Sequence, residues 1–165
     1  MRHNAKVTLD RHDREILARY QHDTQVPAKV IADAVGLSAA AVQRRLKRLR
    51  AEGVIERELA QLDPKALGLP VTCLVSVDLE RERGSDLERF RRKVLAAPEV
   101  QQCYYVTGAT DFVLVVLAES MEAYEGFTRR ALLDDANVRS FTTYVALERV
   151  KVGLGIPLGN RADRS

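Results

Sequence analysis

The sequence has few of the residues that disulfide-rich or metal-binding proteins require. Its two cysteines, Cys73 and Cys103, are too few for a disulfide scaffold and too far apart for a short pair of zinc ligands. The three histidines all lie within the first 22 residues, so a cluster of both residue types would have to bridge the two halves of the chain. We therefore expect no metal site and no cofactor.

Long apolar runs are also missing. The longest wholly apolar run in the second half covers the seven residues 112–118, and about 18 are needed to cross a membrane. The N-terminus has no apolar stretch of signal-peptide length, so we expect a cytoplasmic protein. Hydrophobic residues make up 46% and charged residues 30% of the 165 positions, which predicts a globular chain of one or two domains.

Positive charge is concentrated in one short segment. The net charge is +3, but residues 1–58 carry 12 Lys/Arg against 8 Asp/Glu, whereas residues 59–165 carry 14 against 15. Within residues 38–52 there are five cations and a single acid. Such a stripe on one helix is typical of a phosphate-binding surface, although an isolated basic helix is more often simply solvated. The pattern of the neighbouring residues therefore decides between the two interpretations.

Residues 1–58 predict three helices. The first begins after Asp10, the second opens at Pro27 and ends at Gly36, and the third begins after Ser38 and stops at Gly53. The apolar residues that recur at helical spacing are Ile16, Leu17, Tyr20, Val30, Ile31, Ala34, Val35, Val42, Leu46 and Leu49. A short helix, a glycine-containing turn and a longer basic helix form a helix-turn-helix, and Val54-Ile55 begins a strand-like wing.

The third helix then presents its basic side to solvent, where the N-terminal half of a recognition helix meets base edges. Gln43 can pair with adenine and Arg44 with guanine, while Arg48 and Arg50 lie where phosphate contact is favoured. The predicted DNA-binding residues are Ser38, Ala39, Ala40, Gln43, Arg44, Lys47, Arg48 and Arg50. A small helical bundle without a DNA role is the alternative.

The rest of the chain predicts an α+β domain. Residues 59–70 contain two prolines and a glycine and predict a linker. Strands are expected over 71–79, 100–107, 111–119 and 138–150, with helices over 85–97, capped by Ser85, and over 121–131. This βαββαβ order is ferredoxin-like, and its first two strands are not neighbours, so Cys73 and Cys103 are expected to stay separate. The predicted domains are 1–58, the linker 59–70, and 71–165 with its C-terminal tail.

The strand expected at 111–119 is apolar on both faces. The two helices of a βαββαβ domain cover one face of its sheet, so the other face would leave a large apolar surface in water. The same face of a second copy is the simplest cover, and we expect a homodimer formed through this domain.

Several short motifs, in the same order and spacing, resemble the Lrp/AsnC family of transcriptional regulators over residues 8–158. They are Leu9-Asp10, Val35-Gly36-Leu37-Ser38, Gly53-Val54-Ile55, Leu62-Asp63, Leu67-Gly68, Pro98-Glu99-Val100, Thr107-Gly108-Ala109-Thr110-Asp111-Phe112 and Val150-Lys151. The resemblance implies a winged helix-turn-helix that binds double-stranded DNA and a RAM-type domain that forms dimers and assemblies of dimers. It implies a sequence-specific regulator, not an enzyme, that responds to a small effector, usually an amino acid.

The resemblance places the effector at the loop Thr107, Gly108, Ala109, Thr110 and Asp111. Gly108 permits close backbone approach, backbone amides can hold a carboxylate, and Asp111 can face an ammonium group. The alternative is a plain hairpin turn in which Asp111 caps backbone amides. Thr142 and Thr143 on the last strand are either further hydroxyl contacts or ordinary strand residues.

Two other functions remain as alternatives. Proteins of this architecture include some that resemble siroheme decarboxylases, which are expected to use histidine or other cationic groups in the second half, and residues 59–165 contain no histidine. A ligand-binding module without DNA activity is the other, and the intact basic helix argues against it.

Overall fold

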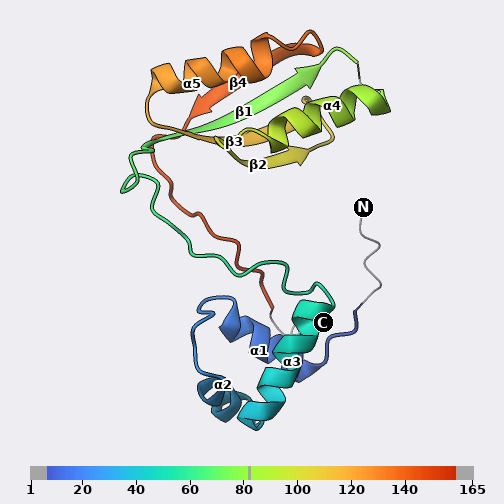
Figure 1. The fold of residues 1–165 in the computed structure, drawn as a ribbon, viewed down its shortest axis with the longest axis vertical. Helices are drawn as coiled ribbons and strands as arrows, with labels where there is room; N and C mark the ends of the chain where they lie inside the picture. The colour runs from blue at the N-terminus through green and yellow to red at the C-terminus, as the bar shows by residue number, and fades with distance from the viewer. Residues whose placement is uncertain (1–6, 82, 159–165) are drawn as a thin grey trace. The chain divides into compact units, whose positions relative to one another are not determined.

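The computed structural model describes residues 7–81 and 83–158. The described chain divides into two compact units. The first combines the residues up to Ala60 with those from Lys151 onward, and the second is Gln61–Val150 (Figure 1). Each unit is described by itself.

The first unit contains three helices, α1 (Arg11–Tyr20), α2 (Ala28–Val35) and α3 (Ala39–Ala51). Asp10 caps α1 through a capping box with Asp13, and Ser38 caps α3 by accepting a hydrogen bond from the Ala41 amide. Gly36 ends α2 with a left-handed φ of 69°, which glycine adopts without steric cost. The predicted helices are therefore confirmed with their caps. Their core consists of Ile16, Tyr20, Ile31, Ala32, Val35, Val42 and Leu46.

Two details of this unit differ from expectation. On α2, Val30 and Ala34 are exposed while Ala32 is buried, so the buried face is rotated from the one predicted. The strand expected to begin at Val54-Ile55 is also absent from the described residues. The amides of both residues donate to the Leu49 carbonyl instead, and Ile55 packs against the helical core.

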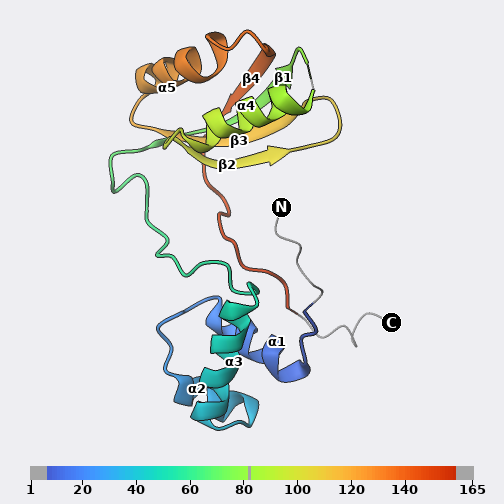
Figure 2. The ribbon, with the colours of Figure 1, turned by 45° about the vertical axis from the view of Figure 1, so that its right-hand side comes forward.

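The second unit has the predicted βαββαβ order. Its elements are β1 (Val71–Leu79), α4 (Gly84–Leu95), β2 (Val100–Tyr105), β3 (Phe112–Ala118), α5 (Met121–Thr128), a π-helical turn (Arg129–Leu133) and β4 (Val138–Val145). The strands form one antiparallel sheet in the order β2-β3-β1-β4 (Figures 1 and 2). A ferredoxin-like α+β fold is thereby confirmed.

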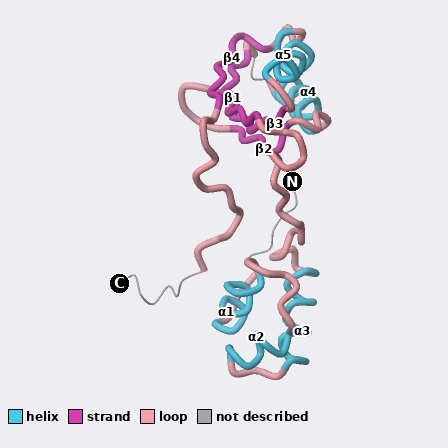
Figure 3. The backbone as a smooth tube through the Cα atoms, turned by 90° about the vertical axis from the view of Figure 1, so that its left-hand side faces the viewer, coloured by secondary structure: helices cyan, strands magenta, loops and turns pink. Residues whose placement is uncertain are grey.

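Helices α4 and α5 lie on the same side of this sheet (Figure 3). The odd positions of β1 and the even positions of β3 point to them, as the alternation predicts for a half-buried strand. The buried residues of this core are Cys73, Val75, Val77, Leu79, Phe90, Val94, Phe112, Leu114, Val116, Ala118, Tyr124, Phe127, Ala131 and Leu132.

The other face of the sheet, here called the open face, has no helix over it within this unit. On it, Leu74 of β1 pairs with Val115 of β3 on one side and with Tyr144 of β4 on the other. Leu74 is 42% and Tyr144 62% exposed. Val113 and Leu117 of β3 and Tyr104 of β2 alternate onto the same face.

Some limits of the second unit differ from expectation. Helix α4 starts at Gly84 and is preceded by Arg83, so Ser85 is not its cap, and β4 ends at Val145. Residues from Lys151 group with the first unit, although the tail was expected to belong to the second domain. There the side-chain nitrogen of Gln21 donates to the Ile156 carbonyl at 3.0 Å, and the side-chain oxygen of Gln21 accepts from the backbone amide of Ile156 at 2.8 Å.

Cys73 and Cys103 lie on the non-adjacent strands β1 and β2 and are free thiols, as predicted. Burial raises the pKa of both thiols above their ordinary value, so both are protonated near neutral pH. Within residues 7–81 and 83–158, none of the helices has the length and apolar character that a membrane crossing needs.

Candidate nucleic-acid interface and effector loop

Helix α3 presents a row of exposed side chains opposite its buried face. Val42, Leu46 and Leu49 are buried, and this orientation turns Ala40, Gln43, Arg44 and Lys47 into solvent. The side chains of the last three form no hydrogen bond or ion pair with any residue that the structure describes. Their donors are therefore available to a ligand. We call Ala40, Gln43, Arg44 and Lys47 the exposed row.

The two residues before the exposed row have structural partners. The Ser38 hydroxyl accepts from the Ala41 amide at 3.2 Å, which caps the helix. Ala39 was predicted to point outward, but it is half-buried against the helical core. It is the first residue of α3 and lies three residues before the buried Val42.

Arg45 and Arg48, on the next side of α3, are held by acids at the start of α1. Arg45 Nη1 donates to Asp10 Oδ2 at 2.6 Å and to Asp13 Oδ1 at 2.8 Å. Arg48 Nη2 donates to Asp13 Oδ2, and its Nε lies 3.7 Å from a Glu52 oxygen. Burial acts to raise the pKa of Asp10, but hydrogen bonds from the Asp13 amide and Arg45 outweigh it, so the pKa is lowered.

Arg50 was predicted to contact DNA phosphates, and the structure gives it a different partner. Its Nη2 donates to Glu58 Oε1 at 2.8 Å and to the Tyr20 hydroxyl at 2.7 Å, and the guanidinium lies 5.6 Å from the Tyr20 ring centre. The Tyr20 hydroxyl also donates to Glu58. Hydrogen bonds from Tyr20 and Arg50 hold the pKa of Glu58 below its ordinary value. This cluster joins α1, α3 and the segment that leaves the unit.

The loop 107–111 joins β2 to β3, and its last two residues are anchored to β1. Asp111 Oδ2 accepts from the Leu79 amide at 2.7 Å, and the Asp111 amide donates to the Val77 carbonyl at 3.1 Å. The Thr110 hydroxyl donates to the same carbonyl at 2.9 Å. The bond from the Leu79 amide to Asp111 is the backbone capping expected if the loop is a plain hairpin turn.

The first three residues of the loop are exposed. Gly108 has a φ of 136°, a conformation that residues with a side chain rarely adopt, and no atom lies within 4 Å of the position a Cβ would take. Thr107 and Ala109 flank it. The loop therefore combines a fixed base with an open tip of exposed backbone.

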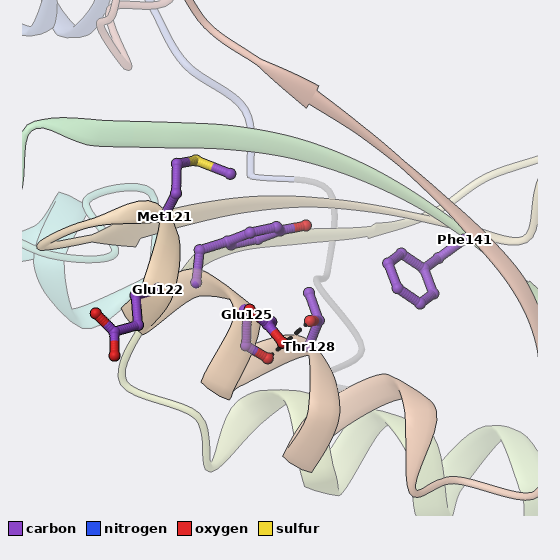
Figure 4. A pocket seen from close by; sticks show the side chains of 6 residues that line it. Met121, Glu122, Glu125, Thr128 and Phe141 are labelled. Atoms are coloured by element: carbon purple, nitrogen blue, oxygen red, sulfur yellow. Dashed lines mark hydrogen bonds between the residues drawn. The ribbon is translucent and has the colours of Figure 1, made fainter.

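The sequence did not indicate the hollow of about 460 Å³ between α5 and β4. Figure 4 shows Met121, Glu122 and Phe141 around it, and Tyr124 also lines it. The Tyr124 hydroxyl is hydrogen-bonded to that of Thr143 at 2.5 Å, so Thr143 acts as an internal strand residue. In the described chain, no group of three His, Cys, Asp or Glu side chains is arranged to hold a metal ion.

Two family models match the chain, one over each unit. A winged helix-turn-helix DNA-binding model matches residues 9–56, and an Lrp/AsnC ligand binding domain model matches residues 72–155. Helix α3 with its exposed row lies in the first match, and loop 107–111 in the second. The class of protein is therefore a DNA-binding transcriptional regulator with a ligand-binding domain.

Relatives agree over nearly the whole length. The HTH-type transcriptional regulator y4tD of Sinorhizobium fredii is 45% identical over 152 residues, 92% of this chain and 90% of its own. The crystal structure of an AsnC family regulator from Agrobacterium tumefaciens is 33% identical with a TM-score of 0.85, covering 91% of this chain and 97% of that one. The complex of a Neisseria meningitidis regulator with L-Met is 29% identical with the same TM-score, covering 92% and 97%. This chain belongs to the Lrp/AsnC family.

The lowered pKa of Glu58 generates a pH prediction. A carboxylate whose folded-state pKa is lowered adds stability above its unfolded pKa and loses it as the pH falls through the folded value. Glu58→Gln should therefore lower the melting temperature at pH 7, and this difference from the wild type should shrink below the ordinary value of 4.5. Thermal unfolding followed by circular dichroism from pH 7 to pH 3 measures it.

Glu56→Gln is the matched control, since Glu56 is exposed and has no hydrogen bond or ion pair to the described residues. A Glu58→Gln difference that stays constant down to pH 3 would show that the ion pair with Arg50 does not stabilise the unit.

Proposed function

We propose that this regulator reads its operator with the exposed row of α3. Gln43 and Arg44 pair with base edges, Lys47 contacts phosphate, and the small Ala40 and the capping Ser38 allow the helix to approach the groove. The observation that carries this assignment is that the side chains of Gln43, Arg44 and Lys47 are exposed and form no hydrogen bond or ion pair with the described residues, whereas Arg50 is occupied by Tyr20 and Glu58. This mode of action needs binding equilibria and no catalytic group, and we expect it in the cytoplasm, where its DNA partner is.

Arg44→Ala tests the base contact. A duplex selected by the wild-type protein from random sequences serves as the specific probe, and an unselected duplex of the same length as the non-specific one. Loss of one bidentate base contact costs about 1–3 kcal/mol, so the ratio of the two affinities should fall roughly 5- to 150-fold. Fluorescence anisotropy at fixed salt measures both affinities.

Arg19→Ala is the control, since Arg19 is exposed on α1 and donates only to the Glu15 carbonyl. It removes the same charge and should leave the ratio unchanged. If Arg44→Ala also leaves it unchanged, Arg44 reads no base.

We propose that the effector is an amino acid bound at the tip of loop 107–111. The neighbour from N. meningitidis supports this class of ligand because it was solved with L-Met. The exposed backbone around Gly108 can hold a carboxylate, with Thr107 and Ala109 beside it. Thr110 and Asp111 have the different task of fixing the loop to β1. To regulate, the ligand must bind one arrangement of the DNA-binding units better than another.

A thermal-shift screen of the twenty amino acids tests this site. A ligand at 100 times its dissociation constant stabilises the native state by about 2.7 kcal/mol, so at least one amino acid should raise the melting temperature. Ala109→Glu places a carboxylate at the open tip and should abolish the shift. Ala123→Glu, at an exposed position in the first turn of α5, should retain it. A flat screen, or a shift that Ala109→Glu retains, contradicts the site.

We also propose that the open face forms a homodimer, from which assemblies of dimers can be built. Leu74, Tyr104 and Tyr144 are between 42% and 62% exposed on a face that no helix of the unit covers. Burying them against the same face of a second copy removes apolar area from water and presents two copies of α3 to one duplex.

Tyr144→Lys places a charge on this face and should shift the wild-type dimer towards monomer in sedimentation equilibrium. Leu95→Lys is the control, because Leu95 is 81% exposed at the end of α4, on the other side of the sheet. A wild-type monomer, or a dimer that Tyr144→Lys leaves intact, would rule out the interface.

A further inference from the structure

A basic hollow of about 330 Å³ lies beside the exposed row of α3. We propose that it is a seat for one phosphate of the DNA backbone, and that the carboxylates of Asp10 and Asp13 position the guanidinium groups that form it. The inference rests on the proposed function, since the phosphate belongs to the bound duplex. The lining residues are Leu37, Ala41, Arg44, Arg45 and Arg48.

The lining follows from helical spacing. Positions 44 and 45 follow position 41 by three and four residues, and position 48 follows them by four and three, so all of them share one side of α3. Arg44 belongs both to this side and to the exposed row, so a phosphate in the hollow lies next to the predicted base contact. Arg45 was not among the residues predicted to bind DNA. Its inclusion comes from the hollow, which brings a third guanidinium to the other two.

The side chain of Asp13 is 1% exposed and uses both of its oxygens. Oδ1 accepts from Arg45, and Oδ2 accepts from Arg48 and from the Asp10 amide. Asp10 adds a second acceptor for Arg45 while its other oxygen accepts from the Asp13 amide. Two arginines of α3 are thus bound to the first turn of α1 through one buried carboxylate.

Each guanidinium keeps donors for a further ligand. A guanidinium has five N–H groups, and the described hydrogen bonds use only Nη1 of Arg45 and Nη2 of Arg48. A planar group held by a carboxylate on one edge can contact a phosphate with another edge. Because its orientation is already set, it loses less conformational freedom when the phosphate binds. Phosphate contacts fix the register of a protein on DNA, so this seat determines where Gln43 and Arg44 meet the bases.

A purely internal role for these arginines predicts different behaviour. Asp10, Asp13 and Glu52 together offset the charges of Arg45 and Arg48, and both arginines would then serve only to join α1 to α3. Salt dependence separates the two roles. The slope of log K against log salt is about −0.9 per phosphate contacted, whereas a residue that only stabilises the fold leaves the slope unchanged.

Arg48→Gln is the first test, with a 30-bp random-sequence duplex titrated between about 50 and 200 mM KCl. Arg48 is 43% exposed, so the variant is expected to fold. The slope should become shallower by about 0.9 for each bound subunit. Arg19→Gln removes an equal charge from α1 and should keep the wild-type slope. An Arg48→Gln slope equal to that of the wild type overturns the phosphate seat.

The second test removes a positioning carboxylate while every cation stays in place. Asn caps helices as well as Asp does, so Asp10→Asn keeps the start of α1. It should bind the same duplex several-fold more weakly than the charge-matched control Asp33→Asn, with the wild-type slope, and its effect should vanish in an Arg45→Gln background. Equal affinities of Asp10→Asn and Asp33→Asn, or a steeper slope for Asp10→Asn, overturn the positioning role.

The two tests also separate this inference from the proposed function. If the wild-type protein shows no salt-dependent binding to duplex DNA, the DNA-binding role itself fails. If the wild type binds, and Arg44→Ala lowers its sequence discrimination while Arg48→Gln keeps its slope, only the phosphate seat fails.

Discussion

The DNA-binding unit depends on one buried carboxylate. Asp13 closes the capping box of α1 and accepts from Arg45 and Arg48 of α3. Removing one partner of a buried ion pair lowers the stability of the folded state, because the other charge stays buried without a counter-charge. The same contact therefore holds the third helix against the first and sets the direction of its arginines. In the proposed phosphate seat, one carboxylate serves both the packing of α3 against α1 and the contact with DNA.

The second unit differs from the first in how its apolar surface is covered. Its strand β3 is apolar on both faces, and α4 and α5 cover one face of the sheet. The core beneath the helices is closed by Phe90, Phe112 and Phe127, each at most 1% exposed. The open face, with Leu74 and Tyr144, has no such cover within the unit. This member of the Lrp/AsnC family thus combines a small helical unit with a sheet that has one face uncovered within its unit.

Much of this arrangement could be predicted from the sequence, because it depends on local rules. The caps at Asp10 and Ser38, the helix end at Gly36 and the alternation along β1 follow from neighbouring residues. The partner of a charged side chain does not follow from its neighbours in the sequence. Arg50 meets Glu58 and Tyr20, and Asp111 meets the Leu79 amide across 32 residues, only after the chain has folded. For that reason the exposure of the row on α3 could be predicted from helical spacing, whereas the half-buried position of Ala39 and the ion pair of Arg50 could not.

The bond between Gln21 and the backbone of Ile156 changes how the chain should be divided. The polypeptide leaves the first unit after residue 60 and returns to it at residue 151, so the second unit is in effect a long insertion within the first. A fragment cut from the N-terminus alone would lack part of its own surface. A fusion that exchanges the ligand-binding part for that of a relative would have to keep both connections to the first unit, the one after residue 60 and the one before residue 151. Such a fusion inserts one domain into a loop of another.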